Sequence, residues 1–102
     1  MNRVILVTGG FDPIHGGHIK YIRSAKKIDP PSPVCVGLNS DDWLIRKKGK
    51  YFMDFDERKE VMSGMKDVDV VIPFIDKDDS ANDAIDMCLQ IYDLVIFCNG
   101  GD

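Results

Sequence analysis

The alternation of short apolar runs with helical patterns constrains the fold of this chain more than any other feature. Four runs rich in β-branched residues occupy residues 4–8, 34–39, 68–74 and 94–98. They are continuous rather than alternating, which is typical of strands that are covered on both faces in a parallel sheet. Because helices connect such strands in right-handed units, the pattern predicts an α/β fold, a doubly wound parallel sheet with helices on both faces.

Helical patterns fill the intervals between these runs, at residues 17–28, 41–49, 54–65 and 81–92. The second pattern is either a short helix or a turn that ends at Gly49. The third begins at a cap, either Asp54 or Asp56. The fourth is the most regular, and Ser80 with Asp83 resembles a capping box at its start.

Length, charge and cysteine content narrow the class of protein. The 102 residues predict one domain, residues 1–102. A net charge of −4 argues against nucleic acid as a partner, and the basic stretch at 45–50 suits a small anionic ligand instead. Without a run of about 18 apolar residues we expect no membrane partner. The three cysteines and the lack of a signal-peptide pattern indicate reduced thiols and a cytoplasmic location.

The loop after the first run, "GGFDPIHGGH" at residues 9–18, holds both histidines of the chain. Ligands of open α/β sheets bind beyond the carboxyl ends of the strands, which is where this loop lies. Gly9 and Gly10 permit a close approach of backbone to ligand, and Gly17 lies at a helix start that can bind an anion. His15 and His18 fall on one side of a helical turn, where both rings could donate to a transferring phosphoryl group.

Other interpretations of the two histidines stay open at this point. They could bind a metal, although no third ligand is evident, and we predict no metal site in the protein. They could also be surface residues or helix caps. The loop matches neither the dinucleotide-binding GxGxxG pattern nor a Walker loop that ends in GK[ST], so it requires a different explanation.

The loop resembles the GxFDxxHxGH signature of the cytidylyltransferase-like nucleotidyltransferases, whose HxGH motif holds the triphosphate and stabilises the transition state. The likeness continues along the chain. "GLNSDDWLIRKKGK" is similar to the family's lysine-bearing segment after the second strand, "FDERKEVM" to its arginine-bearing helix, "VDVVIPF" to the next strand, and "FCNGGD" to its KGGD loop. The resemblance covers essentially all of the chain and implies a Rossmann-like fold.

The resemblance assigns roles to individual residues. It implies catalytic roles for His15, His18, Lys47 and Lys48, with Lys50 as the third lysine candidate. It implies nucleotide contacts for Gly9, Gly10, Phe11, Asp12, Gly17, Arg58, Gly100, Gly101 and Asp102.

Three polar residues and the single tryptophan leave alternatives open. Asp12 either contacts Mg²⁺ or fixes the loop as a turn residue before proline. Asn39 and Asp41 lie where the chain leaves the second run, and they either hold the acceptor substrate or cap the next helix. We expect Trp43 to pack rather than to stack on a ligand.

The family resemblance implies transfer of CMP or AMP from a nucleoside triphosphate to a small phosphorylated alcohol or sugar, with release of pyrophosphate. Mg²⁺ would accompany the triphosphate, and the enzyme would be a homodimer. The expected activity is that of a glycerol-3-phosphate cytidylyltransferase. The alternatives are a heptose-1-phosphate adenylyltransferase, a non-catalytic nucleotide-binding module, and metal-dependent hydrolysis. The family carries a further strand and a Ser/Thr-rich signature that the sequence lacks, so we expect the chain to be incomplete at its C-terminal end.

Overall fold

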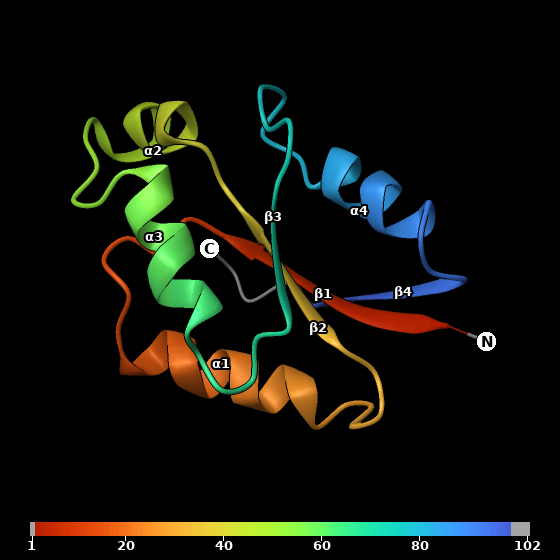
Figure 1. The fold of residues 1–102 in the computed structure, drawn as a ribbon. Helices are drawn as coiled ribbons and strands as arrows, with labels where there is room; N and C mark the ends of the chain where they lie inside the picture. The colour runs from red at the N-terminus through yellow and green to blue at the C-terminus, as the bar shows by residue number, and fades with distance from the viewer. Residues whose placement is uncertain (1, 99–102) are drawn as a thin grey trace.

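Four parallel strands form one sheet in the computed structural model, which describes residues 2–98 (Figure 1). In chain order the elements are β1 (Arg3–Gly9), α1 (Gly16–Lys26), β2 (Val34–Leu38), α2 (Asp41–Lys48), α3 (Phe55–Ser63), β3 (Val70–Pro73), α4 (Asn82–Leu89) and β4 (Leu94–Cys98). The strand order is β3-β2-β1-β4, and all three pairings are parallel. The predicted doubly wound, Rossmann-like α/β fold is thereby confirmed.

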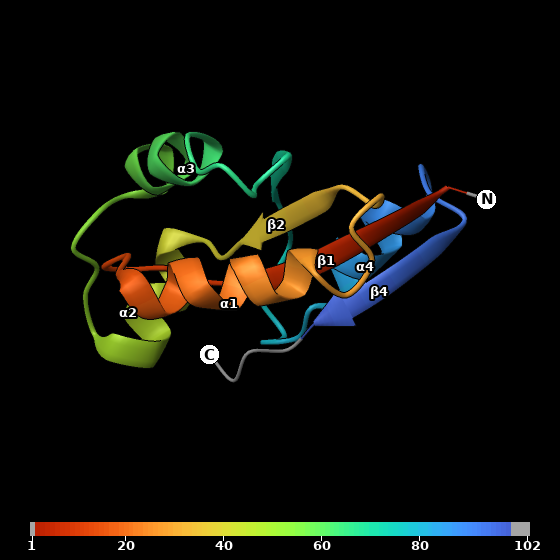
Figure 2. The same ribbon diagram turned by 90° about the horizontal axis from the view of Figure 1, so that it is seen from below.

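Helices cover the two faces of the sheet, and alternate residues of β1 point to different faces. Helices α1 and α3 lie on one face and α4 on the other (Figures 1 and 2). Ile5 and Val7 pack in the cluster that includes Met62 of α3, whereas Val4 and Leu6 pack against α4. Burial on both faces is the physical reason that the central strands β1 and β2 are continuously apolar. The edge strands β3 and β4 are only partly covered, so the prediction of cover on both faces is correct for the two central strands.

Helix α2 covers neither face and lies beyond the carboxyl end of β2 (Figure 1). Its N-cap is Ser40, whose hydroxyl accepts from Trp43 N at 3.1 Å. It ends at Gly49, which has φ of 82°, a left-handed conformation that glycine adopts without a Cβ penalty. Of the two alternatives for this segment, the helix is therefore correct.

The start of α3 agrees with one of the predicted caps, whereas the start of α4 does not have the cap that was predicted. Asp54 caps α3 by accepting from Glu57 N at 2.9 Å, as one alternative anticipated. The capping box predicted at Ser80 and Asp83 is wrong, because the Asp83 carboxylate accepts instead from Ile75 N at 2.7 Å, and α4 begins without a side-chain cap. Within residues 2–98, no helix has the length and apolar character needed to cross a bilayer.

Candidate active site

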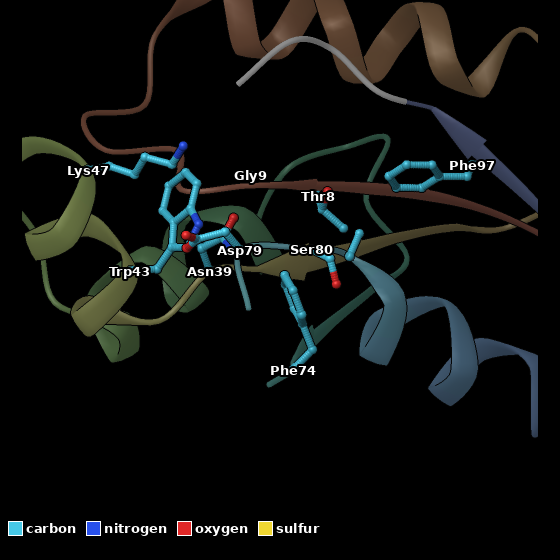
Figure 3. Close-up of a pocket in the computed structure, with 10 residues that line it drawn as sticks. Thr8, Gly9, Asn39, Trp43, Lys47, Phe74, Asp79, Ser80 and Phe97 are labelled. Carbon is cyan, nitrogen blue, oxygen red and sulfur yellow. The ribbon is translucent and has the colours of Figure 1, made fainter. Parts of the chain in front are cut away.

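Two pockets open side by side at the carboxyl ends of the strands. The His pocket has a volume of about 490 Å³ and is lined by Gly10, Phe11, Asp12, Pro13, His15, His18, Trp43, Leu44, Lys47 and Lys48. The Thr8 pocket has a volume of about 460 Å³ and is lined by Thr8, Gly9, Asn39, Trp43, Lys47, Phe74, Asp79, Ser80, Ala81 and Phe97 (Figure 3). The end of the sheet predicted to bind ligand is therefore where both cavities form.

The two histidines form a reciprocal cap at the start of α1. His15 is the N-cap residue, and its Nδ1 accepts from Gly17 N at 3.0 Å. The Nδ1 of His18 in turn accepts from His15 N at 3.2 Å, and the two rings stack with their centroids 3.9 Å apart. Because Nδ1 is the acceptor in both neutral rings, the proton of each ring lies on Nε2. The cap thus fixes both the tautomer and the orientation of the imidazoles.

This cap changes how the helix start can bind an anion. The amides of His15 and Gly17, which would otherwise be available to a phosphate, donate to the two rings. Both His15 and His18 line the His pocket. The helix-capping alternative is therefore correct, and it is compatible with a donor role because capping occupies the other nitrogen of each ring.

Two glycines of the loop are required by the side chains that pack over them. A Cβ on Gly17 would lie 2.9 Å from Cε1 of His15, and a Cβ on Gly10 would lie 2.7 Å from Cδ2 of Leu44. Gly9 lines the Thr8 pocket beneath the Phe11 ring. The geometry explains these residues by packing, and their contact with a nucleotide stays a prediction.

Phe11 and Asp12 support the loop from beneath. Phe11 is 5% exposed and holds φ of 52°, with its ring edge-on to His18 at 5.1 Å between centroids. The buried carboxylate of Asp12 accepts from Phe52 N at 2.6 Å and from Met53 N at 2.9 Å. Both of its oxygens therefore fix the loop, the structural one of the two alternatives stated for Asp12.

Arg58 is fully buried beneath the site. Its Nη1 donates to the carbonyls of Gly10 and Asn39 at 2.9 and 2.8 Å, and Nε donates to the Met53 carbonyl at 3.0 Å. Nη2 forms an ion pair with Asp41 at 2.7 Å. The guanidinium thus braces the ends of β1 and β2 and is not among the lining residues of either pocket, and its contact with a nucleotide stays a prediction that this burial does not favour.

The predicted acceptor-binding residues also have structural partners. Asp41 is engaged by Arg58. Asn39 lines the Thr8 pocket, but its amide donates to Asp76 Oδ2 at 3.1 Å. The buried carboxylate of Asp76 also accepts from the backbone amide and the hydroxyl of Ser40, each at 2.8 Å. Asp76 could not be identified from sequence, because three acids lie close together in that loop and their spacing does not show which one is buried.

The structure separates the three lysine candidates. Lys47 lines both pockets, and its ammonium lies 5.5 Å from the centroid of the Trp43 ring. Lys48 lines the His pocket and donates to the Asp12 carbonyl at 2.6 Å. Lys50 lies over Phe52 and is not among the lining residues of either pocket. Lys47 is the lysine whose position reaches both cavities.

The carboxylates of the site do not suit a metal ion bound by the protein itself. Asp12, Asp41 and Asp76 are already engaged by backbone amides, Arg58 and Ser40. Among residues 2–98, no group of three histidine, cysteine or acidic side chains could hold a metal ion. Mg²⁺ prefers a few carboxylates together with substrate phosphates, and these engaged side chains do not offer that set.

Three predicted nucleotide contacts and the cysteines complete the set of residues considered in the sequence. Gly100, Gly101 and Asp102 lie outside the described residues. The cysteines are free thiols, and burial raises the pKa of Cys35 to about 12. Burial also raises the pKa of Cys88 and of Cys98. A thiol with a raised pKa is a poor nucleophile, so we assign no chemistry to these side chains.

The sequence is similar to a known protein family and to individual members of it. A family model described as cytidylyltransferase-like matches residues 6–93. The bifunctional protein HldE of Shewanella sediminis is 35% identical over 74 residues, which are 71% of this chain and 15% of that protein. The protein of the same name from Haemophilus influenzae is 34% identical over the same shares. The chain thus spans about 15% of the length of these curated relatives.

A solved structure is similar over most of the fold. The crystal structure of the lipopolysaccharide core biosynthesis protein from Thermoplasma volcanium superimposes with a TM-score of 0.69 and 29% sequence identity. The match covers 93% of this chain and 72% of that one.

Proposed function

The chain belongs to the cytidylyltransferase-like family, and on that premise we propose that it is a nucleotidyltransferase domain. It transfers a nucleoside monophosphate from a nucleoside triphosphate to a phosphorylated small molecule and releases pyrophosphate. The observation that carries the proposal is the capped histidine pair. His15 and His18, whose Nδ1 atoms are engaged in the cap, line a pocket that also contains Lys47 and Lys48. Fixed donors and cations around one cavity suit the charge that develops on a transferring phosphoryl group.

The nucleotide that we propose is ATP, and the acceptor is a sugar phosphate. The family resemblance favoured a glycerol-3-phosphate cytidylyltransferase, with a heptose-1-phosphate adenylyltransferase as the alternative. The HldE relatives support that alternative better than the main expectation. The solved relative is a protein of lipopolysaccharide core biosynthesis, which is compatible with a sugar substrate.

The proposed step is an in-line displacement at the α-phosphorus. A phosphate oxygen of the acceptor forms a bond to the α-phosphorus, and the bond from that phosphorus to the oxygen bridging to the β-phosphate breaks. The electron pair leaves with pyrophosphate. Since the attacking oxygen is already anionic, the step requires no general base, and catalysis consists of positioning and charge stabilisation. His15 and His18 donate to the phosphate oxygens, and Lys47 and Lys48 offset the negative charge.

Two further features are proposed from the family resemblance. Mg²⁺ enters with the triphosphate as part of the substrate, because the carboxylates of the site are engaged elsewhere. The protein forms a homodimer, which sedimentation of the full-length protein would test.

Pyrophosphate release by the full-length protein tests the proposed function. ATP and CTP are each paired with heptose 1-phosphate and with glycerol 3-phosphate. We expect release with ATP and heptose 1-phosphate. Release with CTP and glycerol 3-phosphate would instead indicate a glycerol-3-phosphate cytidylyltransferase. Binding of ATP without release by any pair would support a non-catalytic nucleotide-binding module.

A further inference from the structure

Trp43 and Lys47 are shared by the two pockets, whereas the other described lining residues belong to one pocket each. In Figure 3 the Lys47 side chain runs alongside the Trp43 ring, across the Thr8 pocket from Phe97. The two residues are four apart on α2, a spacing that places side chains on the same helix face. The boundary between the cavities is therefore one aromatic ring and the ammonium beside it.

The position of Trp43 is fixed by two contacts, one of its backbone and one of its side chain. Its backbone amide donates to Ser40 Oγ, and Ser40 is held by the buried carboxylate of Asp76. The indole packs over Gly10, where a Cβ would lie 3.2 Å from Trp43 Cζ3. The ring is thus anchored to the ends of β1 and β3, although it belongs to α2.

The two pockets differ in chemistry. The His pocket gathers two imidazole donors and two lysines, which suits a polyphosphate. The Thr8 pocket has Lys47 as its one cation among the described lining residues, beside the carboxylate of Asp79 and the hydroxyls of Thr8 and Ser80. The Asp79 carboxylate is ion-paired with Arg46 at 3.0 Å. The pocket therefore presents one lysine beside a paired carboxylate and hydroxyl groups, a set that suits a hydroxyl-rich molecule with one phosphate better than a triphosphate.

We infer that Trp43 is a positioning residue that separates a nucleotide subsite in the His pocket from a sugar-phosphate subsite in the Thr8 pocket. It holds the Lys47 ammonium at their boundary. The inference rests on the proposed function and adds a role for an aromatic side chain. Lys47 then contacts both the phosphates of the nucleotide and the phosphate of the sugar, which lie on opposite sides of the Trp43 ring. Trp43 acts on the reaction by holding Lys47 and by shaping both subsites.

The chain contains a matched control for this pair. Lys50 lies 5.3 Å from the centroid of Phe52, which is nearly the separation of Lys47 from Trp43, but neither Lys50 nor Phe52 lines the two pockets. The variants Phe52→Leu and Lys50→Met therefore remove the same kind of contact from the same region without altering the boundary.

Intrinsic fluorescence tests the inference directly, because Trp43 is the only tryptophan in the sequence. In the full-length protein, with any tryptophan outside residues 1–102 replaced by phenylalanine, we titrate Mg²⁺ with ATP and, separately, heptose 1-phosphate. Each ligand alone should change the emission of Trp43. A change with only one ligand, or with neither, would overturn the shared boundary. This result does not depend on turnover, so it stays distinct from a failure of the proposed function.

Kinetics supply the second measurement. Trp43→Leu should lower kcat/KM for both substrates by about 10-fold, Trp43→Phe should restore most of the loss, and Phe52→Leu should match the parent. Lys47→Met, at an exposed position, should lower kcat by about 100-fold, and adding Trp43→Leu should cause little further loss. Independent, additive losses, or a change in KM for one substrate alone, would contradict the positioning role.

Discussion

The start of α1 and the whole of α2 both present polar groups to the His pocket, but they are held in different ways. The rings of His15 and His18 are fixed by amides two and three residues away in sequence. Helix α2 is held by residues far along the chain, through Asp41 to Arg58 and through Ser40 to Asp76. The hydrogen-bond donors are therefore set locally, whereas the position of the cations depends on the tertiary fold.

The largest effect should come from breaking the brace that joins these regions. Arg58→Met leaves Asp41 and the carbonyls of Gly10 and Asn39 without their buried partner. Loss of one member of a buried ion pair costs about 3–5 kcal/mol, so the free energy of unfolding in urea should fall by that amount. Lys59→Met, an exposed neighbour on α3, serves as the control. Equal stability of the two variants would contradict the buried role.

The second prediction separates the capping role of His15 from its donor role. His15→Asn keeps a side chain that can cap α1, whereas His15→Ala removes both functions. Both variants should lower kcat by about 100- to 1,000-fold, as loss of one preorganised donor does. Only the alanine variant should also lose about 1 kcal/mol of stability. Pyrophosphate release and urea unfolding measure the two effects, and near-normal turnover of His15→Asn would exclude the imidazole as a donor.

The smallest effect compares two adjacent glycines. In Gly17→Ala the new methyl group would lie 2.9 Å from Cε1 of His15, whereas at Gly16 it meets nothing within 4 Å. We expect Gly17→Ala to displace the ring and lower kcat/KM by about 10-fold. Gly16→Ala should keep its activity and gain about 0.5 kcal/mol in stability. Steady-state kinetics and thermal unfolding check the pair, and equal activities would show that the ring tolerates displacement.

The sheet and the histidine loop could be predicted from sequence because each has a local signal. Continuous apolar runs identify the strands, of which β1 and β2 are covered on both faces, and "GGFDPIHGGH" is a compact motif. The burial of Arg58 has no such signal, since an arginine on a helix has the same local pattern whether it faces solvent or bridges two strand ends. The partners of Arg58 lie 5 to 48 residues away, and only the fold brings them together.

The wrong capping box at α4 has the same origin. Ser80 and Asp83 have the spacing of a capping box, but the amide of Ile75 is available to the Asp83 carboxylate. A tertiary contact that competes for a side chain is not visible in the spacing of two residues. Asp76 could not be identified from sequence for a similar reason. Its role is to accept hydrogen bonds from Asn39 and Ser40, which follow another strand.

The α-helical geometry of α2 gives the lysine doublet a directional meaning. Consecutive residues on a helix project about 100° apart, and accordingly Lys47 lies against Trp43 while Lys48 reaches the Asp12 carbonyl. An alignment of "RKKG" that is shifted by one position still matches a lysine to a lysine. The shift nevertheless exchanges Lys47 for Lys48, whose side chains point in different directions. Relatives should therefore be compared by the angular register of their lysines around this helix, counted from its cap at Ser40.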